Sequence, residues 1–369
     1  MWAGRRHRDC RSINRGESDV ATRREFVVAV VLATVIGTPA LADSAERTAA
    51  RRRALRWIRR RLFGGDQRRS GRGSAAGLRR LLAPGARLER VATGAAWSEG
   101  PVWLPRERVV RWSDVPGDRI LEWDAATGET RVHREHVEFT NGRTLDCEGR
   151  VVQCSHGRRA IEREVDGDVE VLVERHGKAR LNSPNDVVVA SDGAIWFTDP
   201  PYGIVQPHEG HPGKREYGGC HVFRFVEAMG ELSVATTAVQ EPNGLAFSPD
   251  ERILYVSDTS VALRRDGTGE HCIRTFSVSE QWQLTPLGVL ATIEPGVPDG
   301  LRVDVEGRVW TSSADGVQVF GADGAALGRI PVPEVVGNLC FGGEDGHDLF
   351  IAASTSLYRI RTATRDAAA

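Results

Sequence analysis

The chain has 369 residues, 40% of them hydrophobic and 27% charged, and contains 40 glycines but only 2 methionines. This composition is typical of a soluble, turn-rich protein that buries a large core. The net charge of −1 hides an asymmetry: residues 1–84 carry +13 (20 Lys and Arg against 7 Asp and Glu) and residues 85–369 carry −14 (29 against 43). Because the second part is acidic, we expect no nucleic-acid partner there.

The first 42 residues are typical of a targeting segment. Arg23 and Arg24 precede the apolar run 27–36 and the small-residue cleavage pattern Ala40-Leu41-Ala42. Paired arginines before a modest hydrophobic core indicate a twin-arginine export signal. An uncleaved membrane anchor is the alternative, but about 15 apolar residues fall short of the roughly 20 that a spanning helix needs. We expect a signal peptide over 1–42, an exported, periplasmic or secreted protein, and no transmembrane span in its mature form.

Residues 43–84 form an Arg-rich stretch with three consecutive arginines at 51–53 and again at 59–61, followed by a Gly- and Ser-rich segment at 64–77. We expect a linker that is partly helical or disordered. The alternative is a segment attracted to anionic lipid or envelope polymer. The folded domain is expected to occupy residues 85–369.

The cysteines give no strong pattern. Six are present without a C-x-x-C pair, and removal of Cys10 with the signal leaves five. Cys147 and Cys154 flank one predicted hairpin turn without being evidently opposite each other, so a disulfide between them stays an alternative. A protein exported already folded would not need one.

A hairpin unit with a polar head recurs along the folded domain. In one copy, Asn185 precedes the apolar strand 187–190, the turn Ser191-Asp192-Gly193 and the return strand 194–198, which ends at Asp199. A short Val-rich run, an Asp-Gly turn and an aromatic or β-branched return strand are typical of a β-hairpin. The six copies begin at Glu99, Asn141, Asn185, Asn243, Asp299 and Gly337.

The spacing of these units predicts the fold. In the first five copies the head lies 13 or 14 residues before the Ser or Thr of the return strand, and successive copies start 42, 44, 58, 56 and 38 residues apart. This is the period of a β-propeller blade, with extra loop in the third and fourth. We therefore expect an all-β domain, a six-bladed β-propeller with four-stranded antiparallel blades, preceded by the signal peptide and basic linker. Ring closure should pair a strand before Trp97 with strands near 357–360.

Equivalent positions in successive blades converge on one axis, so the six heads should form a ring. Two carboxylates and three side-chain amides, with no His or Cys, are hard oxygen donors that suit Ca²⁺, or Mg²⁺ or Mn²⁺. The alternative is that the Asn-Gly and Asp-Gly pairs are ordinary turn formers. Recurrence of a side-chain oxygen at one blade position favours a metal site.

Five longer motifs overlap the hairpin units: SEGPVW (98–103), RLNSPND (180–186), WFTDPPYG (196–203), PNGLAFSPDE (242–251) and PDGLRVD (298–304). With these motifs, the stretch from about residue 91 to 360 resembles the gluconolactonase, regucalcin and senescence marker protein family of six-bladed propellers, with diisopropylfluorophosphatase a more distant relative.

The resemblance implies a role for each motif residue. The residues matching the family's metal ligands are Glu99, Asn185, Asn243 and Asp299, and Asp299 also matches the catalytic carboxylate. The residues expected to contact substrate are Arg180, Asn182, Asn141 and Glu216. Asn182 could share or replace the contact of Arg180. As an alternative, Asn141 could contact the metal ligands and not the substrate. For His156 a structural and a functional role stay equally open.

The leading hypothesis is hydrolysis of a sugar lactone, an aldono-1,5-lactone opened to the aldonate, with one divalent cation, Ca²⁺ ahead of Mg²⁺, Mn²⁺ or Zn²⁺. The cation would polarise the carbonyl and Asp299 would activate water. A phosphotriesterase-like hydrolase on the same site and a non-catalytic ligand-binding propeller are the alternatives. The chain has no G-x-S-x-G, H-E-x-x-H or G-x-G-x-x-G before a predicted helix, which disfavours a serine hydrolase. The expected partner is a small lactone, and the protein is expected to be a monomer.

Export gives the first testable prediction. If the paired arginines form a twin-arginine signal, replacing Arg23 and Arg24 with Lys should leave the precursor in the cytoplasm and remove the processed form that begins near Asp43. Immunoblots of cell fractions against an N-terminal antibody and a C-terminal tag measure both species. Unchanged processing would contradict the assignment.

Overall fold

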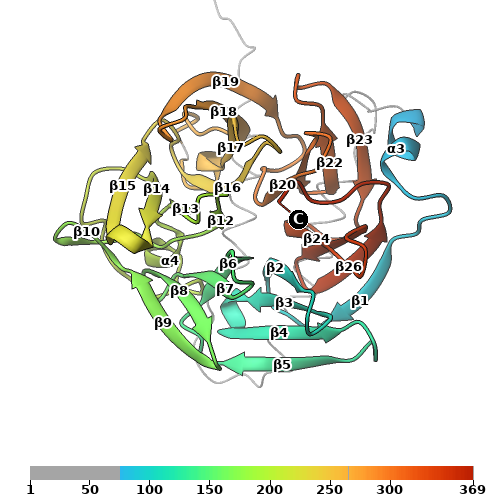
Figure 1. Cartoon of the computed structure of the whole chain (residues 1–369), viewed down its shortest axis with the longest axis horizontal. Helices are drawn as coiled ribbons and strands as arrows, with labels where there is room; N and C mark the ends of the chain where they lie inside the picture. The colour runs from blue at the N-terminus through green and yellow to red at the C-terminus, as the bar shows by residue number, and fades with distance from the viewer. Residues whose placement is uncertain (1–74, 265, 369) are drawn as a thin grey trace, which may run out of the picture. The chain divides into compact units, whose positions relative to one another are not determined.

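The computed structural model describes residues 75–264 and 266–368. The expected signal peptide and almost all of the expected linker lie outside these residues. The described part forms six four-stranded sheets arranged around a central axis (Figure 1), with every strand pairing antiparallel. The prediction of a six-bladed β-propeller is therefore confirmed.

The strands of blades 1 to 5 run outward from the axis in chain order, and in blade 6 the strand β1 takes the outermost place. Blade 1 contains β2 (Ser98–Leu104), β3 (Val109–Asp114), β4 (Arg119–Asp124) and β5 (Thr130–Glu135); blade 2 contains β6 (Thr140–Leu145), β7 (Val151–Ser155), β8 (Ala160–Val165) and β9 (Asp168–Val173). Blade 3 contains β12 (Val187–Val189), β13 (Ile195–Asp199), β14 (His221–Val226) and β15 (Glu231–Thr236); blade 4 contains β16 (Pro242–Phe247), β17 (Ile253–Asp258), β18 (Cys272–Val278) and β19 (Leu284–Thr292). Blade 5 contains β20 (Leu301–Val303), β21 (Val309–Ser313), β22 (Gly316–Phe320) and β23 (Ala326–Pro331); blade 6 contains β24 (Val336–Gly342), β25 (Asp348–Ala353), β26 (Ser356–Arg361) and β1 (Glu89–Thr93).

The ring closes through the sixth blade, where the first strand of the domain pairs with the last. β1 lies antiparallel to β26, with Glu89 opposite Arg359 and Thr93 opposite Ser356. An ion pair of 2.7 Å between Arg359 and Glu89 adds to the backbone ladder. Closure by a strand from before Trp97 is thus confirmed, and it joins the two ends of the domain in one sheet.

Helical segments are short in the described part of the chain. They are α3 (Ala75–Leu81), α4 (Tyr202–Val205) and the 3₁₀ turns η1 (Val115–Gly117), η2 (Glu227–Met229) and η3 (Ser260–Ala262). The connection between blades 2 and 3 contains a two-stranded hairpin, β10 (Arg175–His176) with β11 (Ala179–Arg180). Within these residues no helix has both the length and the apolar character to span a bilayer. The five described cysteines are all free, Cys147 and Cys154 included.

Tryptophans on the second strands fill the space between blades. Trp112 of β3, Trp196 of β13 and Trp310 of β21 are almost completely buried, and each lies in a cluster with side chains from the neighbouring blade. Trp310, for example, meets Phe341 of blade 6 edge to face at 5.6 Å between ring centroids. These three side chains therefore pack between blades, as expected for large aromatic residues on buried strands.

The glycines that follow the heads sit where neighbouring inner strands touch. A Cβ atom added at Gly244 would lie 2.5 Å from the Asp299 carbonyl oxygen, and one at Gly142 would lie 2.4 Å from Asp186 Oδ1. Asn141-Gly142 and Asn243-Gly244 lie inside β6 and β16, not at hairpin turns. These glycines therefore permit close approach of adjacent blades, a use distinct from turn formation.

This close approach gives the second prediction. Gly244→Ala should destabilise the domain by about 1–3 kcal/mol, because the new methyl group meets backbone that cannot move aside. Gly218→Ala is the matched control, since a Cβ there meets nothing within 4 Å. Urea unfolding followed by tryptophan fluorescence measures both. Equal stability of the two variants would contradict the packing account.

Candidate active site

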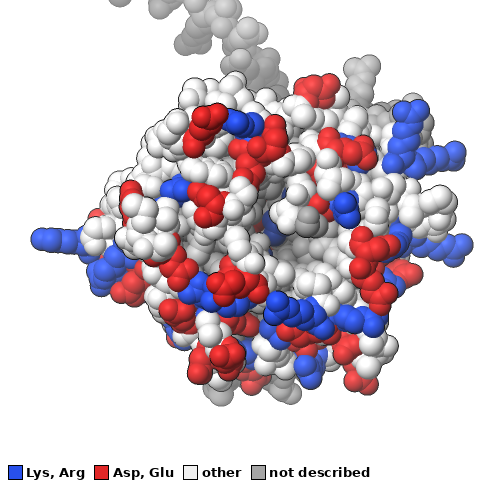
Figure 2. All heavy atoms as spheres, viewed as in Figure 1, with Lys and Arg blue, Asp and Glu red and all other residues white. Residues whose placement is uncertain are grey.

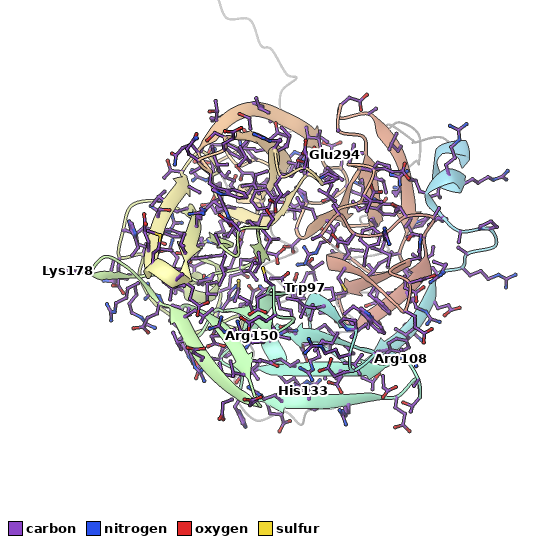
Figure 3. The ribbon with its side chains drawn as sticks, viewed as in Figure 1. Trp97, Arg108, His133, Arg150, Lys178 and Glu294 are labelled. Carbon is purple, nitrogen blue, oxygen red and sulfur yellow. The ribbon has the colours of Figure 1, made fainter. Side chains whose placement is uncertain are left out.

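The inner strands β2, β6, β12, β16, β20 and β24 surround the axis (Figure 1). Each head residue lies at the start of one of these strands or just before it. Glu99, Asn141 and Asn243 lie within the first residues of β2, β6 and β16, while Asn185 and Asp299 lie two residues before β12 and β20. The sixth position is Gly337 in β24. Trp97, two residues before Glu99, lies near the middle of the propeller, whereas His133 and Lys178 lie at its outer edge (Figure 3).

Aspartates at the ends of second strands hold the segments that lead into the inner strands. Each carboxylate accepts two backbone N–H bonds: Asp114 from Ala96 and Trp97 (2.7 and 3.1 Å), Asp199 from Asn182 and Ser183 (2.7 and 2.8 Å), and Asp258 from Gln240 and Glu241 (3.0 and 3.5 Å). A charged acceptor makes such bonds stronger than neutral ones. The recurring Ser-Asp and Thr-Asp pairs therefore fix the position at which each inner strand starts.

Backbone bonds between blades use the carbonyl groups of the heads. The N–H of Gly142 donates to the Asn185 carbonyl (2.8 Å), and the N–H of Gly244 donates to the Asp299 carbonyl (3.0 Å). Ser113 Oγ likewise donates to the Asn141 carbonyl at 3.0 Å. The carbonyl oxygens of Asn185, Asp299 and Asn141 thus each accept a hydrogen bond, so the side-chain oxygens of these heads are the better candidates for binding a ligand.

Glu99 and Asp299 meet at the axis although 200 residues separate them in the sequence. The Asp299 carboxyl lies close enough to the side chains of Asn243 and Glu99 for both to affect its pKa. Glu99 accepts hydrogen bonds from Trp97 Nε1 and from the Gly100 N–H, both at 3.2 Å. The structure thus places three of the four expected metal ligands within interaction range of one another.

Burial and mutual repulsion keep both carboxyl groups from ionising easily. Desolvation, followed by the charges of Asp299 and Asp186, raises the pKa of Glu99 well above its usual range. Desolvation, followed by the charge of Glu209, raises the pKa of Asp299 to about 7, although its hydrogen bond from Asn243 opposes this. Two carboxyl groups without a bonded cationic side chain would ionise together only if a cation compensated them.

Asn185 is connected to the neighbouring head position by its backbone, because its carbonyl accepts the Gly142 N–H of blade 2 at 2.8 Å. Its side chain is buried, and its N–H donates to the Thr198 carbonyl of its own blade at 2.9 Å. In the described part of the chain no three His, Cys, Asp or Glu side chains are grouped so as to hold a metal ion. Metal binding at this ring would therefore depend on amide oxygens in addition to the two carboxylates.

A buried charged layer lies next to the carboxylate pair. Arg302 Nη1 and Asn338 Nδ2 each lie 3.5 Å from Asp186 Oδ2, and Asp186 has no exposed surface. Asp186 raises the pKa values of both Glu99 and Asp299 by its charge. Sequence reasoning missed this layer, although each member directly follows or lies within a motif that it identified.

The predicted substrate contacts fall into two groups. Asn141 belongs to the ring. Asn182 is fully buried and donates through Nδ2 to the carbonyls of Asp199 (3.0 Å) and Gly219 (3.2 Å). Arg180 donates through Nη2 to the Arg158 carbonyl (2.7 Å) and through its N–H to Glu216 Oε2 (2.8 Å). The contacts of these three outer residues connect blades 2 and 3 and do not include Glu99 or Asp299.

The loop 206–219 brings a further carboxylate to the site that sequence reasoning missed. Glu209 is partly buried, and desolvation followed by the charge of Glu99 raises its pKa to about 7. His211 Nε2 lies 2.9 Å from Glu138 and Arg215 lies 3.6 Å from Glu241, so the loop is tied to residues that precede β6 and β16. No motif marks Glu209, because its placement depends on the path of the loop.

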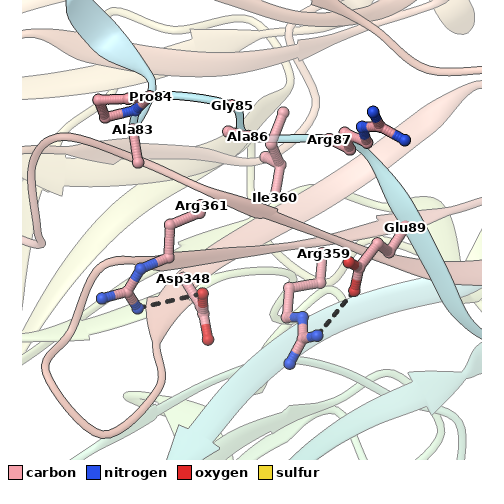
Figure 4. Close-up of a pocket in the computed structure, with 10 residues that line it drawn as sticks. All are labelled: Ala83, Pro84, Gly85, Ala86, Arg87, Glu89, Asp348, Arg359, Ile360 and Arg361. Atoms are coloured by element: carbon pink, nitrogen blue, oxygen red, sulfur yellow. Dashed lines mark hydrogen bonds and ion pairs between the residues drawn. The ribbon is translucent and has the colours of Figure 1, made fainter.

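Two cavities lie away from the ring. One of about 410 Å³ lies between residues 83–87 and β26, beside the Arg359–Glu89 and Arg361–Asp348 ion pairs (Figure 4). Another of about 340 Å³ is lined by residues that include Trp103, Trp123 and Phe350. Neither cavity is lined by a head residue.

Figure 2 shows a hollow near the middle of the propeller, with acidic and basic side chains interspersed around it. The ring of heads is the candidate site because polar side chains converge there, and not because of the size of a cavity.

Residues 97–355 match the family described as the SMP-30/Gluconolactonase/LRE-like region. The chain belongs to this family. A gluconolactonase of Zymomonas mobilis is 33% identical over 299 residues, which are 75% of this chain and 82% of that protein. A pentonolactonase of Haloferax volcanii is 29% identical over 273 residues, 72% of this chain and 84% of that protein. A solved gluconolactonase structure from Xanthomonas campestris is 41% identical with a TM-score of 0.72, covering 79% of this chain and 94% of that one.

The raised pKa of Asp299 gives the third prediction. Between about pH 4, near the unfolded value, and about pH 7, the folded value, the folded protein binds more protons than the unfolded chain. The free energy of unfolding of metal-free protein should therefore fall as pH rises through this window. Asp299→Asn should fall less steeply, because it removes one such group.

Urea unfolding in the presence of EDTA, repeated across this pH range, measures the difference. Asp168→Asn, at an exposed position that begins β9, is the matched control and should follow wild type. Parallel curves for wild type and Asp299→Asn would show that Asp299 ionises normally and would contradict the geometry described above.

Proposed function

We propose that the protein is a lactonase that opens a sugar lactone, an aldono-1,5-lactone, to the aldonate. Family membership and the gluconolactonase and pentonolactonase relatives support the reaction class. The observation that carries the assignment to this site is the close approach of the Glu99 and Asp299 carboxyl groups at the axis, with the Asn243 side chain beside Asp299. We also propose that the protein is exported, on the strength of Arg23, Arg24 and the apolar run after them.

A divalent cation fits the donor set of the ring. Buried carboxylates that repel each other, beside amides whose main-chain groups are already bonded, are suited to a hard cation that prefers oxygen. The residues that would hold it are Glu99, Asn185, Asn243 and Asp299, and Ca²⁺ is the ion we propose first. When bound, the cation would polarise the lactone carbonyl and stabilise the charge that develops on its oxygen.

The side chains of the site divide the remaining work. Asp299 would accept a proton from water as the water oxygen attacks the carbonyl carbon, and return it to the ring oxygen as the carbon–oxygen bond breaks. Without a cation the pKa of Asp299 is raised to about 7. A bound cation would lower this pKa and hold Asp299 as the carboxylate, the form that accepts a proton from water. The Trp97 indole is partly exposed and is held by its bond to Glu99, so it offers an apolar face beside the reacting atoms.

The fourth prediction separates the two carboxylates. Glu99→Gln should mainly weaken cation affinity, because an amide keeps an oxygen donor but loses the charge. Asp299→Asn should retain more of that affinity yet lose activity by a factor on the order of 10² to 10⁴, because the base is removed. Calorimetric Ca²⁺ titration and initial rates with glucono-1,5-lactone measure the two properties separately.

Asp168→Asn again serves as the control and should match wild type in both measurements. Full lactone hydrolysis by Asp299→Asn would overturn the assignment of the base. If wild type opened no lactone but hydrolysed organophosphates with the same ion, a phosphotriesterase would replace the lactonase. Absence of any turnover and of any ion binding would favour a ligand-binding propeller.

A further inference from the structure

A buried hydrogen-bond chain connects the loop 206–219 to Asn141, one of the six heads around the axis. His156 follows β7 and has no exposed surface. Its Nδ1 lies 2.9 Å from the Glu209 carbonyl oxygen, and its Nε2 lies 3.2 Å from Asn141 Nδ2. The imidazole is also closely packed, since a Cβ added at Gly203 would lie 2.6 Å from His156 Cβ and 2.8 Å from its Cγ. The imidazole of His156 therefore has little freedom to rotate.

The chemistry of the partners fixes the tautomer of His156. A carbonyl oxygen only accepts, so the hydrogen must be on Nδ1. Desolvation lowers the pKa of His156 to about 4, so the imidazole is neutral near pH 7. Nε2 is then an acceptor, and Asn141 must present its NH₂ group to it. This orientation of the amide follows from the hydrogen-bond partners of the neutral imidazole.

The same orientation leaves the amide oxygen of Asn141 free. Asn141 is 4% exposed, and its Oδ1 atom is buried without a hydrogen-bond partner. Its place in the ring is next to Glu99, because a Cβ added at Gly100 would lie 2.1 Å from the Asn141 carbonyl oxygen. An unpaired buried acceptor is unfavourable, so a ligand that donates a hydrogen bond there would recover that loss.

We propose that His156 is a positioning residue that directs the Asn141 amide oxygen to a hydroxyl group of the substrate, so that the site selects hydroxylated lactones over unsubstituted ones. The inference rests on the lactonase function proposed above. It extends that function by naming the donor that the site recognises and by giving the loop 206–219 a part in specificity through the Glu209 carbonyl. A site with an oriented acceptor discriminates strongly against an analogue that lacks the matching donor.

A double-mutant cycle tests the coupling. The quantity measured is the ratio of kcat/KM for glucono-1,5-lactone to kcat/KM for δ-valerolactone, which has the same ring without hydroxyl groups. His156→Leu and Asn141→Ala should each lower this ratio by about tenfold, the order expected for one hydrogen bond. The double variant should be no lower than Asn141→Ala, because His156 acts through Asn141.

Two further variants separate positioning from folding. His156→Gln offers an oxygen acceptor near the place of Nε2 and should retain a higher ratio than His156→Leu. His133→Gln, at the outer edge of the ring (Figure 3), is the matched control and should keep the wild-type ratio. Additive losses in the double variant, or equal loss in the Gln and Leu variants, would overturn the positioning role.

The tautomer can be measured without substrate. Long-range proton–nitrogen NMR spectra of ¹⁵N-labelled wild type at pH 7 should show an Nδ1-protonated histidine whose signal is absent from His156→Gln. The signal of His271, whose Nδ1 lies 2.8 Å from the Ile293 carbonyl oxygen, should remain. An Nε2-protonated signal for His156 would overturn the inference even if the protein is a lactonase. Conversely, an Nδ1 signal together with no turnover of either lactone would refute the proposed function, and with it the substrate selected, while leaving the hydrogen-bond chain intact.

Discussion

The site depends on the contact between neighbouring inner strands. Gly244 can donate to the Asp299 carbonyl only because it has no side chain, and Gly142 approaches Asn185 and Asp186 for the same reason. Through these contacts the polar heads of separate blades are drawn to one axis. Closure of the ring by β1 and β26 then holds the first head, Glu99, in register with the others. Without this close approach the two carboxyl groups would not meet.

Bringing the carboxyl groups together creates the electrostatic feature on which the proposed chemistry rests. Desolvation and repulsion raise the pKa values of Glu99, Asp299 and the loop carboxylate Glu209. Folding against this repulsion is tolerable because the network of hydrogen bonds from Trp97, Gly100 and Asn243 offsets part of it. The same repulsion favours the binding of a cation, which would hold Asp299 as the carboxylate that can accept a proton from water. Stability and function thus oppose each other at the axis, as is common at catalytic sites.

The sequence was sufficient for the fold because each blade repeats the same local signals. The spacing between heads and return strands predicted six hairpins, and the early strand predicted the closure seen in blade 6. The ring positions of Glu99, Asn243 and Asp299 followed from the same repeat. Asp186 and Asn338 were missed because each stands one residue after a head position, where an alternating strand pattern would not direct attention. Glu209 was missed for a different reason: it lies on a loop outside the repeat, and only the folded path of 206–219 brings it near Glu99.

The central claim is that the axial carboxylates and amides form one cation site at which a lactone is opened. The most direct measurement is a crystal structure of the wild-type protein soaked with Mn²⁺, with an anomalous difference map collected above and below the manganese edge. The account predicts a single strong peak at the axis, ligated by oxygens of Glu99, Asn185, Asn243 and Asp299. A map without a peak at the axis, or a peak bound only by surface carboxylates elsewhere, would contradict it.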